Sequence, residues 1–294
     1  QAAAGAQVAD MIRGFFPVLL LLPLFVQAQT AQPPQVGGRA WVVADLSSGQ
    51  VLGAEKPDER LEPASLTKLM TAYLVFAALK ENKLALEQQV SVSERARRTP
   101  GSRMFIEPGS PVTVEDLIRG MVVQSGNDAC VALAELLAGS EEAFAKLMNG
   151  EAGRLGMRNS RFMNSTGLSD PQHYSSARDL QLLAAALIRD FPGEYASYYS
   201  QRQFRYNNIT QVNRNKLLWL DASVDGVKTG FTDAAGYCLI ASSQRGPRRL
   251  LSVLLGSTSE TTRAQESQKL LNWGFQFFDA VRLYAGGAAV KELE

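Results

Sequence analysis

Strand-forming segments lie at both ends of this sequence, and helical segments lie between them. Residues 39–55 alternate apolar and polar side chains around a Ser-Gly turn, which is typical of a hairpin. From about residue 223, three further strands are expected in VDGVKTGFT, GYCLIASSQ and RRLLSVLLGS, and the turn RGPR joins the last two. Sequential hairpins favour an antiparallel sheet over a doubly wound parallel one. The sequence therefore predicts an α+β fold in which N- and C-terminal strands form one antiparallel sheet covered by helices.

Helical segments with recognisable N-terminal caps occupy the middle of the chain. Thr113 and Asp116 have the spacing of a capping box, and Ser176 and Asp179 have the same spacing before another apolar run. The run that Thr113 opens is interrupted at residues 125–127, after which a second apolar helix is expected. The expected helices are 65 to about 80, 113–139 with this break, 140–156, 175–191 and about 260–280.

The composition argues against several classes of protein. Lys and Arg number 30 and Asp and Glu number 29, so no nucleic-acid partner is expected. His173 is the only histidine, which argues against a zinc site and against a Ser-His-Asp triad. Its place in a polar loop before a helix cap favours a structural histidine bonded to backbone. Cys130 and Cys238 lack metal-ligand spacing, and nothing favours a disulfide between them. Cys130 is expected in the core or as a free thiol near the cleft, and no cofactor is expected.

The first forty residues have the features of an export signal rather than of a fold. A basic start at Met11 precedes the apolar run FFPVLLLLPLFV (15–26), and small residues follow near Ala28. This order predicts a secretory signal peptide cleaved near Ala28, with an uncleaved membrane anchor as the alternative. The run is shorter than the roughly 20 residues of a spanning helix and contains prolines, which favours cleavage. Residues 1–28 are therefore expected to be upstream residues and signal peptide, and 29–38 a disordered lead-in.

Ser65 and Lys68 form the only S-x-x-K pattern in the chain, at the expected start of a helix. At this spacing the two side chains share one helix face, so the lysine nitrogen lies near the serine hydroxyl. A serine nucleophile needs an activating base. A lysine serves if burial, a second cation or a helix dipole lowers its pKa toward neutrality. Taken alone, the pattern is better explained by a serine that caps the helix and a lysine exposed to solvent than by a catalytic pair.

The motif Ser125-Gly126-Asn127 lies in the predicted helix break. Its serine offers a hydroxyl that can relay protons, and its asparagine offers an amide that can hold a substrate carbonyl. As structure alone, the motif would be an interhelical loop.

The motif Lys228-Thr229-Gly230 lies in the first of the late strands. Lys228 offers a second cation that would lower the pKa of Lys68 and attract a carboxylate, and Thr229 offers a hydroxyl donor. Gly230 lets a substrate backbone approach the strand edge. As structure alone, the motif would be a strand with an exposed lysine and a glycine bulge.

The three motifs, in this order, are those of class A β-lactamases and penicillin-binding proteins. The stretches PASLTKLMTAY, GMVVQSGNDACVALAELLAG, TQVNRNKLLW, VDGVKTGFT and RRLLSVLLGS resemble the low-molecular-mass D-alanyl-D-alanine carboxypeptidases of the penicillin-binding protein 5 type. The resemblance covers about residues 38–285. It implies a β-lactamase-like catalytic domain at 39–280, the start of a truncated β-rich domain at 281–294, and possible inner-membrane association through a further C-terminal segment. It also implies a periplasmic enzyme that acts on peptidoglycan stem peptides ending in D-Ala-D-Ala and is acylated by β-lactams.

The same resemblance implies roles around the scissile bond. Ser65 would be the acylated nucleophile and Lys68 its general base. Ser125 would pass a proton to the leaving D-alanine, and Asn127 would hold the amide on the acyl side. The oxyanion hole would consist of the backbone N–H groups of Ser65 and Phe231. Because some relatives carry histidine at the position of Phe231, no side-chain preference for substrate is implied there.

On the leaving-group side, the resemblance implies that Lys228 and Thr229 face the terminal carboxylate and that Gly230 lets the substrate approach. Arg214 and Arg263 match family arginines linked to the site, and a bidentate guanidinium suits a carboxylate. For each arginine, a structural salt bridge is an equal alternative.

Three other functions share much of this pattern. A class A β-lactamase would need a deacylating glutamate in an E-x-x-L-N loop, and neither Glu142 nor Glu151 has that spacing, so penicillin is expected to leave Ser65 slowly. A DD-endopeptidase uses the same chemistry, but QSGNDAC resembles the carboxypeptidases more closely. A non-catalytic sensor of β-lactams or peptidoglycan would need no nucleophile, so the presence of Ser65 and Lys68 counts against it.

The loop SRMFIEPGS (102–110) either borders the site or is a plain surface turn.

Overall fold

The structure is a computed structural model that describes residues 31–281, and from Pro33 onward the described residues belong to one compact unit. The predicted signal peptide at 1–28 and the stretch 282–294 lie outside the described residues. None of the described helices is long and apolar enough to cross a membrane.

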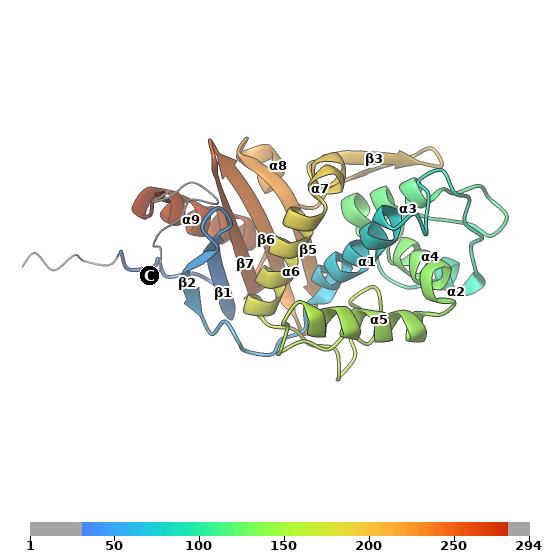
Figure 1. The fold of residues 1–294 in the computed structure, drawn as a ribbon, viewed down its shortest axis with the longest axis horizontal. Coiled ribbons are helices and arrows are strands. Elements are labelled where there is room, and N and C mark those ends of the chain that lie inside the picture. Colours follow the sequence, from blue (N-terminus) through green and yellow to red (C-terminus); the bar gives the residue numbers. More distant parts are fainter. Residues whose placement is uncertain (1–30, 282–294) are drawn as a thin grey trace, which may run out of the picture. The chain divides into compact units, whose positions relative to one another are not determined.

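Five antiparallel strands form the central sheet: β1 (Ala40–Asp45), β2 (Gln50–Glu55), β5 (Val224–Thr232), β6 (Gly236–Arg245) and β7 (Arg248–Ser257). Their order in the sheet is β2-β1-β7-β6-β5 (Figure 1). β1, from the N-terminal hairpin, pairs with β7, so that Val42 lies opposite Val253. This pairing confirms the predicted α+β fold with one antiparallel sheet built from both ends of the chain. β5 pairs with β6 alone and is therefore an edge strand.

Helices cover both faces of this sheet. Trp41 of β1 shares an apolar cluster with Trp273 of α9 (Glu260–Phe277). The next residue, Val42, belongs to the main core, which includes the buried face of α6 (Ala177–Asp190). Successive side chains of a strand point to opposite faces, so covering both faces buries all of β1.

The helices predicted for the middle of the chain are present, with their predicted caps. Thr113 and Asp116 form a capping box, and the Ser176 side chain accepts a hydrogen bond from the Asp179 N–H at the start of α6. The segments are η1 (Ala64–Thr67), α1 (Lys68–Lys80), α3 (Val114–Arg119), η2 (Gly120–Gln124), α4 (Asn127–Ala138) and α5 (Glu141–Arg154). In Figure 1 they form a helical layer beside the β5 side of the sheet.

Two of these segments differ in detail from a plain α-helix, and both carry predicted site residues. The helix expected from residue 65 begins with the 3₁₀ turn η1. The predicted break at 125–127 follows the π-helical turn η2. Ser125 then adopts a left-handed conformation with φ 67°, which few non-glycine residues adopt.

Several short elements were not predicted, among them a second hairpin that packs against the helical layer. The hairpin turns at Asn207 and Asn208, both of which have positive φ. The short elements are α2 (Glu94–Arg98), α7 (Pro192–Tyr198), β3 (Gln203–Tyr206), β4 (Ile209–Val212) and α8 (Leu217–Leu220).

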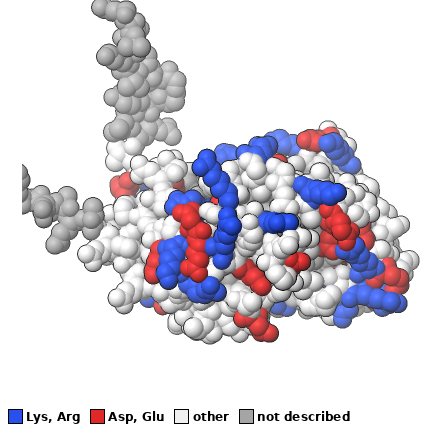
Figure 2. Space-filling view, turned by 90° about the horizontal axis from the view of Figure 1, so that it is seen from below, with Lys and Arg blue, Asp and Glu red and all other residues white. Residues whose placement is uncertain are grey.

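Acidic and basic side chains are intermixed on the face drawn in Figure 2, and neither sign forms one continuous area there. Surface ion pairs such as Arg178–Asp58 (2.8 Å) and Arg95–Glu142 (2.8 Å) join the two signs. The charges that nearly cancel over the whole sequence are thus also intermixed on this face.

Candidate active site

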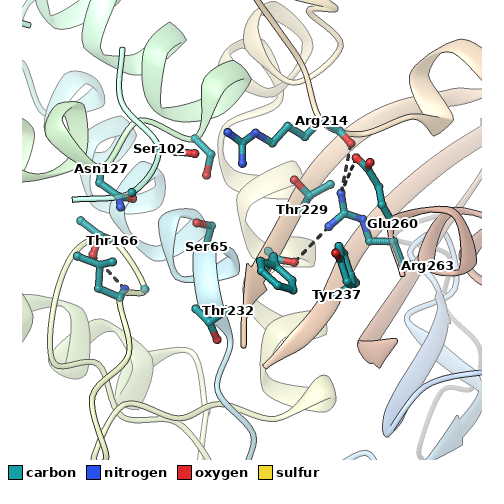
Figure 3. Close-up of a pocket in the computed structure, with 16 residues that line it drawn as sticks. Ser65, Ser102, Asn127, Thr166, Arg214, Thr229, Thr232, Tyr237, Glu260 and Arg263 are labelled. Atoms are coloured by element: carbon teal, nitrogen blue, oxygen red, sulfur yellow. Dashed lines mark hydrogen bonds and ion pairs between the residues drawn. The ribbon is translucent and has the colours of Figure 1, made fainter. Parts of the chain in front are cut away.

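Ser65 and Lys68 are brought together by the turn that precedes α1. Ser65 lies in η1 and faces the cavity in Figure 3, and Lys68 is the first residue of α1. In a 3₁₀ turn, side chains three residues apart eclipse one another. The distance from Lys68 Nζ to Ser65 Oγ is 2.9 Å. The serine hydroxyl therefore lies within hydrogen-bond reach of an amine that can take its proton.

The surroundings of Lys68 favour its neutral form. Its side chain is only 1% exposed, and Nζ also donates to Asn127 Oδ1 (2.7 Å) and to the carbonyl oxygen of Thr166 (2.6 Å). Burial is the main cause that lowers the pKa of Lys68 to about 8, and the charge of Arg214 acts in the same direction. An appreciable fraction of Lys68 is therefore neutral at mildly alkaline pH.

A second pair of hydroxyl and lysine adjoins the same cavity, which Ser125 lines. Lys228 Nζ donates to Ser125 Oγ (2.9 Å) and to the carbonyl oxygen of Thr229 (3.1 Å), and the Ser125 and Lys228 side chains are buried. Burial and then the charge of Lys68 hold the pKa of Lys228 well below its usual value. The charge of Arg214 lowers the pKa of both lysines.

Both ends of the Asn127 side-chain amide are engaged within the protein. Oδ1 accepts from Lys68, and Nδ2 donates to the carbonyl oxygen of Pro100 (2.7 Å). A Cβ at Gly101, where φ is 85°, would lie 2.8 Å from that nitrogen. In this arrangement Asn127 positions Lys68, and its predicted contact with a substrate amide would require one of these bonds to exchange.

The loop that contains Thr166, which was not predicted to be part of the site, supplies the third partner of Lys68. Asn164 Oδ1 accepts hydrogen bonds from Thr166 N (3.2 Å), Thr166 Oγ1 (2.9 Å) and Gly167 N (2.7 Å). These bonds hold the loop in the conformation in which the Thr166 carbonyl meets Lys68. Gly167 has φ 83°, and a Cβ there would overlap the Ala64 carbonyl oxygen in η1. The run Asn-Ser-Thr-Gly has the composition of a tight turn, which was the available signal.

The loop at 102–110 borders the site. This agrees with the first of the two interpretations given for it, and not with a plain surface turn. Ser102 lines the cavity, and its carbonyl oxygen accepts from the Asn127 N–H (2.7 Å). The buried Asp128 carboxylate ties the same loop to α4. It accepts from the backbone N–H groups of Met104 (3.0 Å), Phe105 (2.8 Å) and Ile106 (3.3 Å).

The two predicted arginines lie in different environments. Arg263 is buried, and it donates to the carbonyl oxygens of Gly230 (3.3 Å) and Arg214 (3.5 Å) and pairs with Glu260 (3.3 Å). It therefore supports the strand and the arginine beside it. Arg214 lines the cavity and extends toward Ser102 in Figure 3, and it has no acidic partner among residues 31–281. Of the two, Arg214 is the one available to a carboxylate.

The edge strand β5 closes the other side of the cavity. A Cβ at Gly230 would lie 3.0 Å from the Pro63 carbonyl oxygen and 3.2 Å from the Ser65 nitrogen, so a side chain there would crowd η1. Phe231 is 48% exposed and its ring lies 4.4 Å from that of Tyr237. Ser65 and Phe231, whose backbone N–H groups are the predicted oxyanion donors, thus lie on two segments that pack against each other at Gly230, and both residues line the cavity.

The cavity enclosed by these residues has a volume of about 530 Å³, within the range of small-molecule sites. All ten predicted site residues line it or donate to a residue that does. Eight of them line it: Ser65, Ser125, Asn127, Arg214, Thr229, Gly230, Phe231 and Arg263. The other two, Lys68 and Lys228, donate to Ser65 and Ser125. The described residues contain no group of three or more His, Cys, Asp or Glu side chains that could hold a metal ion.

His173 and Cys130 are both buried beside the site. His173 Nδ1 accepts from the Met163 N–H (3.3 Å), so Nε2 carries the proton toward Thr67 Oγ1 (2.9 Å). Burial lowers the pKa of His173 to about 4 and raises that of Cys130 to about 12. Both cysteines are free. The structural interpretation of His173 agrees with these contacts, and the Cys130 thiol stays protonated at physiological pH.

Comparison with known proteins agrees with this geometry. A family model described as D-alanyl-D-alanine carboxypeptidase, peptidase family S11, matches residues 27–259. The chain is 47% identical over 287 residues to the D-alanyl-D-alanine carboxypeptidase DacC of Escherichia coli, covering 94% of this chain and 72% of that protein. Across the curated carboxypeptidases to which it is 46–47% identical, the chain spans 63% to 72% of their length.

Solved structures show the same fold. Penicillin-binding protein 5 of Haemophilus influenzae superposes with a TM-score of 0.81 at 45% identity, over 83% of this chain and 72% of that one. Penicillin-binding protein D2 of Listeria monocytogenes, in an ampicillin-bound form, superposes with a TM-score of 0.76 at 32% identity, over 83% of this chain and 100% of that one. The chain therefore belongs to the D-alanyl-D-alanine carboxypeptidase family, peptidase family S11, which confirms the resemblance seen in its motifs.

Proposed function

We propose that this protein removes the terminal D-alanine from peptidoglycan stem pentapeptides through an acyl-enzyme on Ser65. The observation that carries the proposal is the contact of Ser65 Oγ with the buried Lys68 amine at 2.9 Å, together with a pKa of about 8 for that lysine. A serine beside a base that is partly neutral near physiological pH is an activated nucleophile.

Acylation uses both pairs of hydroxyl and lysine. Ser65 Oγ attacks the carbonyl carbon of the penultimate D-alanine, and neutral Lys68 takes the hydroxyl proton. The backbone N–H groups of Ser65 and Phe231 donate to the oxygen that becomes negative. The bond from that carbon to the leaving nitrogen then breaks. Ser125 gives a proton to the leaving amine and regains one from Lys228, to which it is bonded at 2.9 Å.

The leaving-group side recognises the terminal carboxylate. Arg214 extends over the cavity without an acidic partner in the described chain, and Thr229 lines the same wall. A free guanidinium and a hydroxyl are suitable donors to a carboxylate. Arg263 acts indirectly, because it holds the backbone of Arg214 and of Gly230.

Hydrolysis of the acyl-enzyme ester regenerates the free enzyme. Lys68 gives the proton it has received to solvent, and Lys228 regains one from solvent. Neutral Lys68 then takes a proton from a water that attacks the ester carbon, and it gives that proton to Ser65 Oγ as the ester bond breaks. β-Lactams acylate the same serine, by the same attack on a carbonyl. Because the E-x-x-L-N loop of class A β-lactamases is absent from the sequence, we expect the penicilloyl ester to be hydrolysed slowly.

The test is intact-mass analysis after incubation with benzylpenicillin, on the wild type and on Ser65→Ala. The wild type is expected to gain the mass of one penicillin and the variant none. An unmodified wild type, or a variant that still gains the adduct, would contradict the assignment. Release of free D-alanine from a D-Ala-D-Ala peptide separates an enzyme from a sensor. Release from a cross-linked peptide dimer, at a higher rate than from the monomer, would favour the endopeptidase instead.

We also propose export to the periplasm and association with the inner membrane through a further C-terminal segment. The support is the signal-like run at 15–26 and the resemblance to relatives that the chain spans only in part. Cell fractionation of the full-length protein, with and without residues 15–26, tests the export step.

A further inference from the structure

A carboxylate bonded to the cavity-lining Thr232 is held in place and has no cationic partner within residues 31–281. Glu62 Oε2 accepts a hydrogen bond from Ser169 Oγ (2.8 Å) and another from Thr232 Oγ1 (3.0 Å). These two bonds tie the segment before η1 to the loop after Leu168 and to the end of β5. The second oxygen, Oε1, has no hydrogen bond, and Glu62 has no ion pair, within residues 31–281.

Two other glutamates around the site already have cationic partners. Glu260, which lines the cavity, pairs with Lys216 (3.1 Å) and Arg263 (3.3 Å). Glu141, beneath the loop that holds Lys68, pairs with Arg95 (2.9 Å). Glu62 is therefore the positioned carboxylate near the cavity that is left to interact with a charge on the substrate. Asp233 follows Thr232 in the turn, but it is exposed and no hydrogen bond within the described chain holds its carboxylate.

The direction of the substrate follows from the walls of the cavity. Arg214 and Thr232 lie on opposite sides of Ser65 in Figure 3. With its carboxylate at Arg214 and its scissile carbonyl at Ser65, a peptide added to the free edge of β5 extends toward Thr232. Consecutive residues of a strand are about 3.3 Å apart, so the third residue from the carboxyl end lies about 7 Å from the last. Its side chain then reaches the end of β5, where Glu62 is bonded to Thr232.

We propose that Glu62 is a specificity-determining residue that binds the ammonium group on the side chain of a diamino acid, at the third position from the carboxyl end of the stem peptide. The proposal rests on the function proposed above and names the substrate class of the same site. The attraction is that of a partly exposed ion pair, which typically contributes about 0.2–1 kcal/mol. The upper part of this range, from about 0.4 kcal/mol, corresponds to a preference of about two- to fivefold.

The test compares two synthetic peptides that end in D-Ala-D-Ala and differ only at the third residue, lysine in one and Nε-acetyl-lysine in the other. The wild type is expected to show a kcat/KM about two- to fivefold higher for the lysine peptide. Glu62→Gln keeps a side-chain oxygen for Ser169 and Thr232 but removes the charge. We expect this variant to lose the preference because its kcat/KM falls for the lysine peptide and stays unchanged for the Nε-acetyl-lysine peptide. Benzylpenicillin should still acylate it at the wild-type rate.

Two control variants assign the effect to its residue. Glu81→Gln removes one negative charge from an exposed pair with Lys83 at the end of α1, and it should keep the wild-type preference. Asp233→Asn should keep most of it. Equal preference in the wild type and in Glu62→Gln, or its loss in Asp233→Asn instead, would overturn the proposal. A wild type that releases D-alanine equally from both peptides would overturn the role of Glu62 alone, whereas one that releases none from either would overturn the proposed function as well.

Discussion

Lys68 determines how the rate of acylation depends on pH. Its amine must be neutral to take the Ser65 proton, and burial places its pKa at about 8. The fraction of neutral lysine, and with it the rate of acylation by benzylpenicillin, should therefore rise as the pH increases through about 8 and then level off. Stopped-flow or mass-resolved acylation rates between pH 6 and 10 measure this. A rate that is flat across that range would exclude Lys68 as the base.

Substitution of the same residue gives the size of its contribution. General-base catalysis typically contributes about 10²–10⁴-fold, so Lys68→Ala should slow acylation by at least about 10²-fold. Lys80→Ala is the matched control, because that lysine ends the same helix and is exposed. An acylation rate in Lys68→Ala equal to that of Lys80→Ala would contradict the assignment.

At the scale of single residues, side-chain chemistry was predictable and backbone chemistry was not. Ser65, Lys68 and Lys228 were identified because they stand in three motifs whose order resembles that of the penicillin-binding proteins. The Thr166 carbonyl, which accepts from Lys68 at 2.6 Å, is a group that every residue carries. Its position depends on the Asn164 hydrogen bonds and on a contact with η1 nearly a hundred residues away in sequence. No local pattern contains that information.

At the scale of elements, the loop at 163–169 and η1 fit together through one glycine. Gly167 has φ 83°, and a Cβ would overlap the Ala64 carbonyl oxygen. Gly167→Ala should therefore displace η1 and with it Ser65. We expect it to lower the free energy of unfolding by more than the roughly 1–2 kcal/mol of left-handed strain and to slow acylation by tenfold or more. Chemical denaturation and the rate of benzylpenicillin adduct formation measure the two effects.

Gly139→Ala separates backbone strain from the overlap. Gly139 also has φ 78°, at the end of α4, but nothing lies within 4 Å of its Cβ position. This variant should lower the free energy of unfolding only by the backbone strain, and benzylpenicillin should acylate it at the wild-type rate. If the two variants lost equal stability and both kept full acylation, the contact between the loop and η1 would not be what positions Ser65.

Elements with strong local signals were predicted, and those that depend on tertiary contacts were missed. The capping box at Thr113 and the N-cap at Ser176 mark two helix starts that were predicted, because capping is a local hydrogen bond. The π-helical turn before Ser125 has no such signal. The hairpin β3–β4 has strands of four residues, too short for a period-2 pattern to stand out, although its Asn207-Asn208 turn is of the kind that accepts positive φ.

At the scale of the whole molecule, the sheet joins strands that are about two hundred residues apart. The fold class followed from hairpins at both ends of the chain. The strand order did not, since each hairpin pairs locally, and only packing decides that β1 lies against β7. That order leaves β5 at the edge, and an edge strand is what a peptide substrate needs for pairing. The position of the site in the sheet is thus a property of the complete fold.

The single histidine links the stability of the whole molecule to pH. Burial lowers the pKa of His173 to about 4 from 6.5. Between these values the unfolded chain binds a proton that the folded chain does not, so stability is fully present above about pH 6.5 and falls as the pH drops toward 4. The loss amounts to something on the order of 3 kcal/mol, from about 1.4 kcal/mol for each pH unit.

His173→Gln should be less stable at pH 7, because the bonds to Thr67 and the Met163 N–H are altered, but its stability should fall less steeply between pH 6.5 and 4. Denaturation curves of both proteins at several pH values measure that difference in slope. NMR provides an independent measurement, since the one imidazole in the chain needs no assignment among others. An imidazole that titrates near 6.5 in the folded protein would mean that the ring is solvated, and that the packing of the loop at 163–169 against α1 is looser than its hydrogen bonds imply.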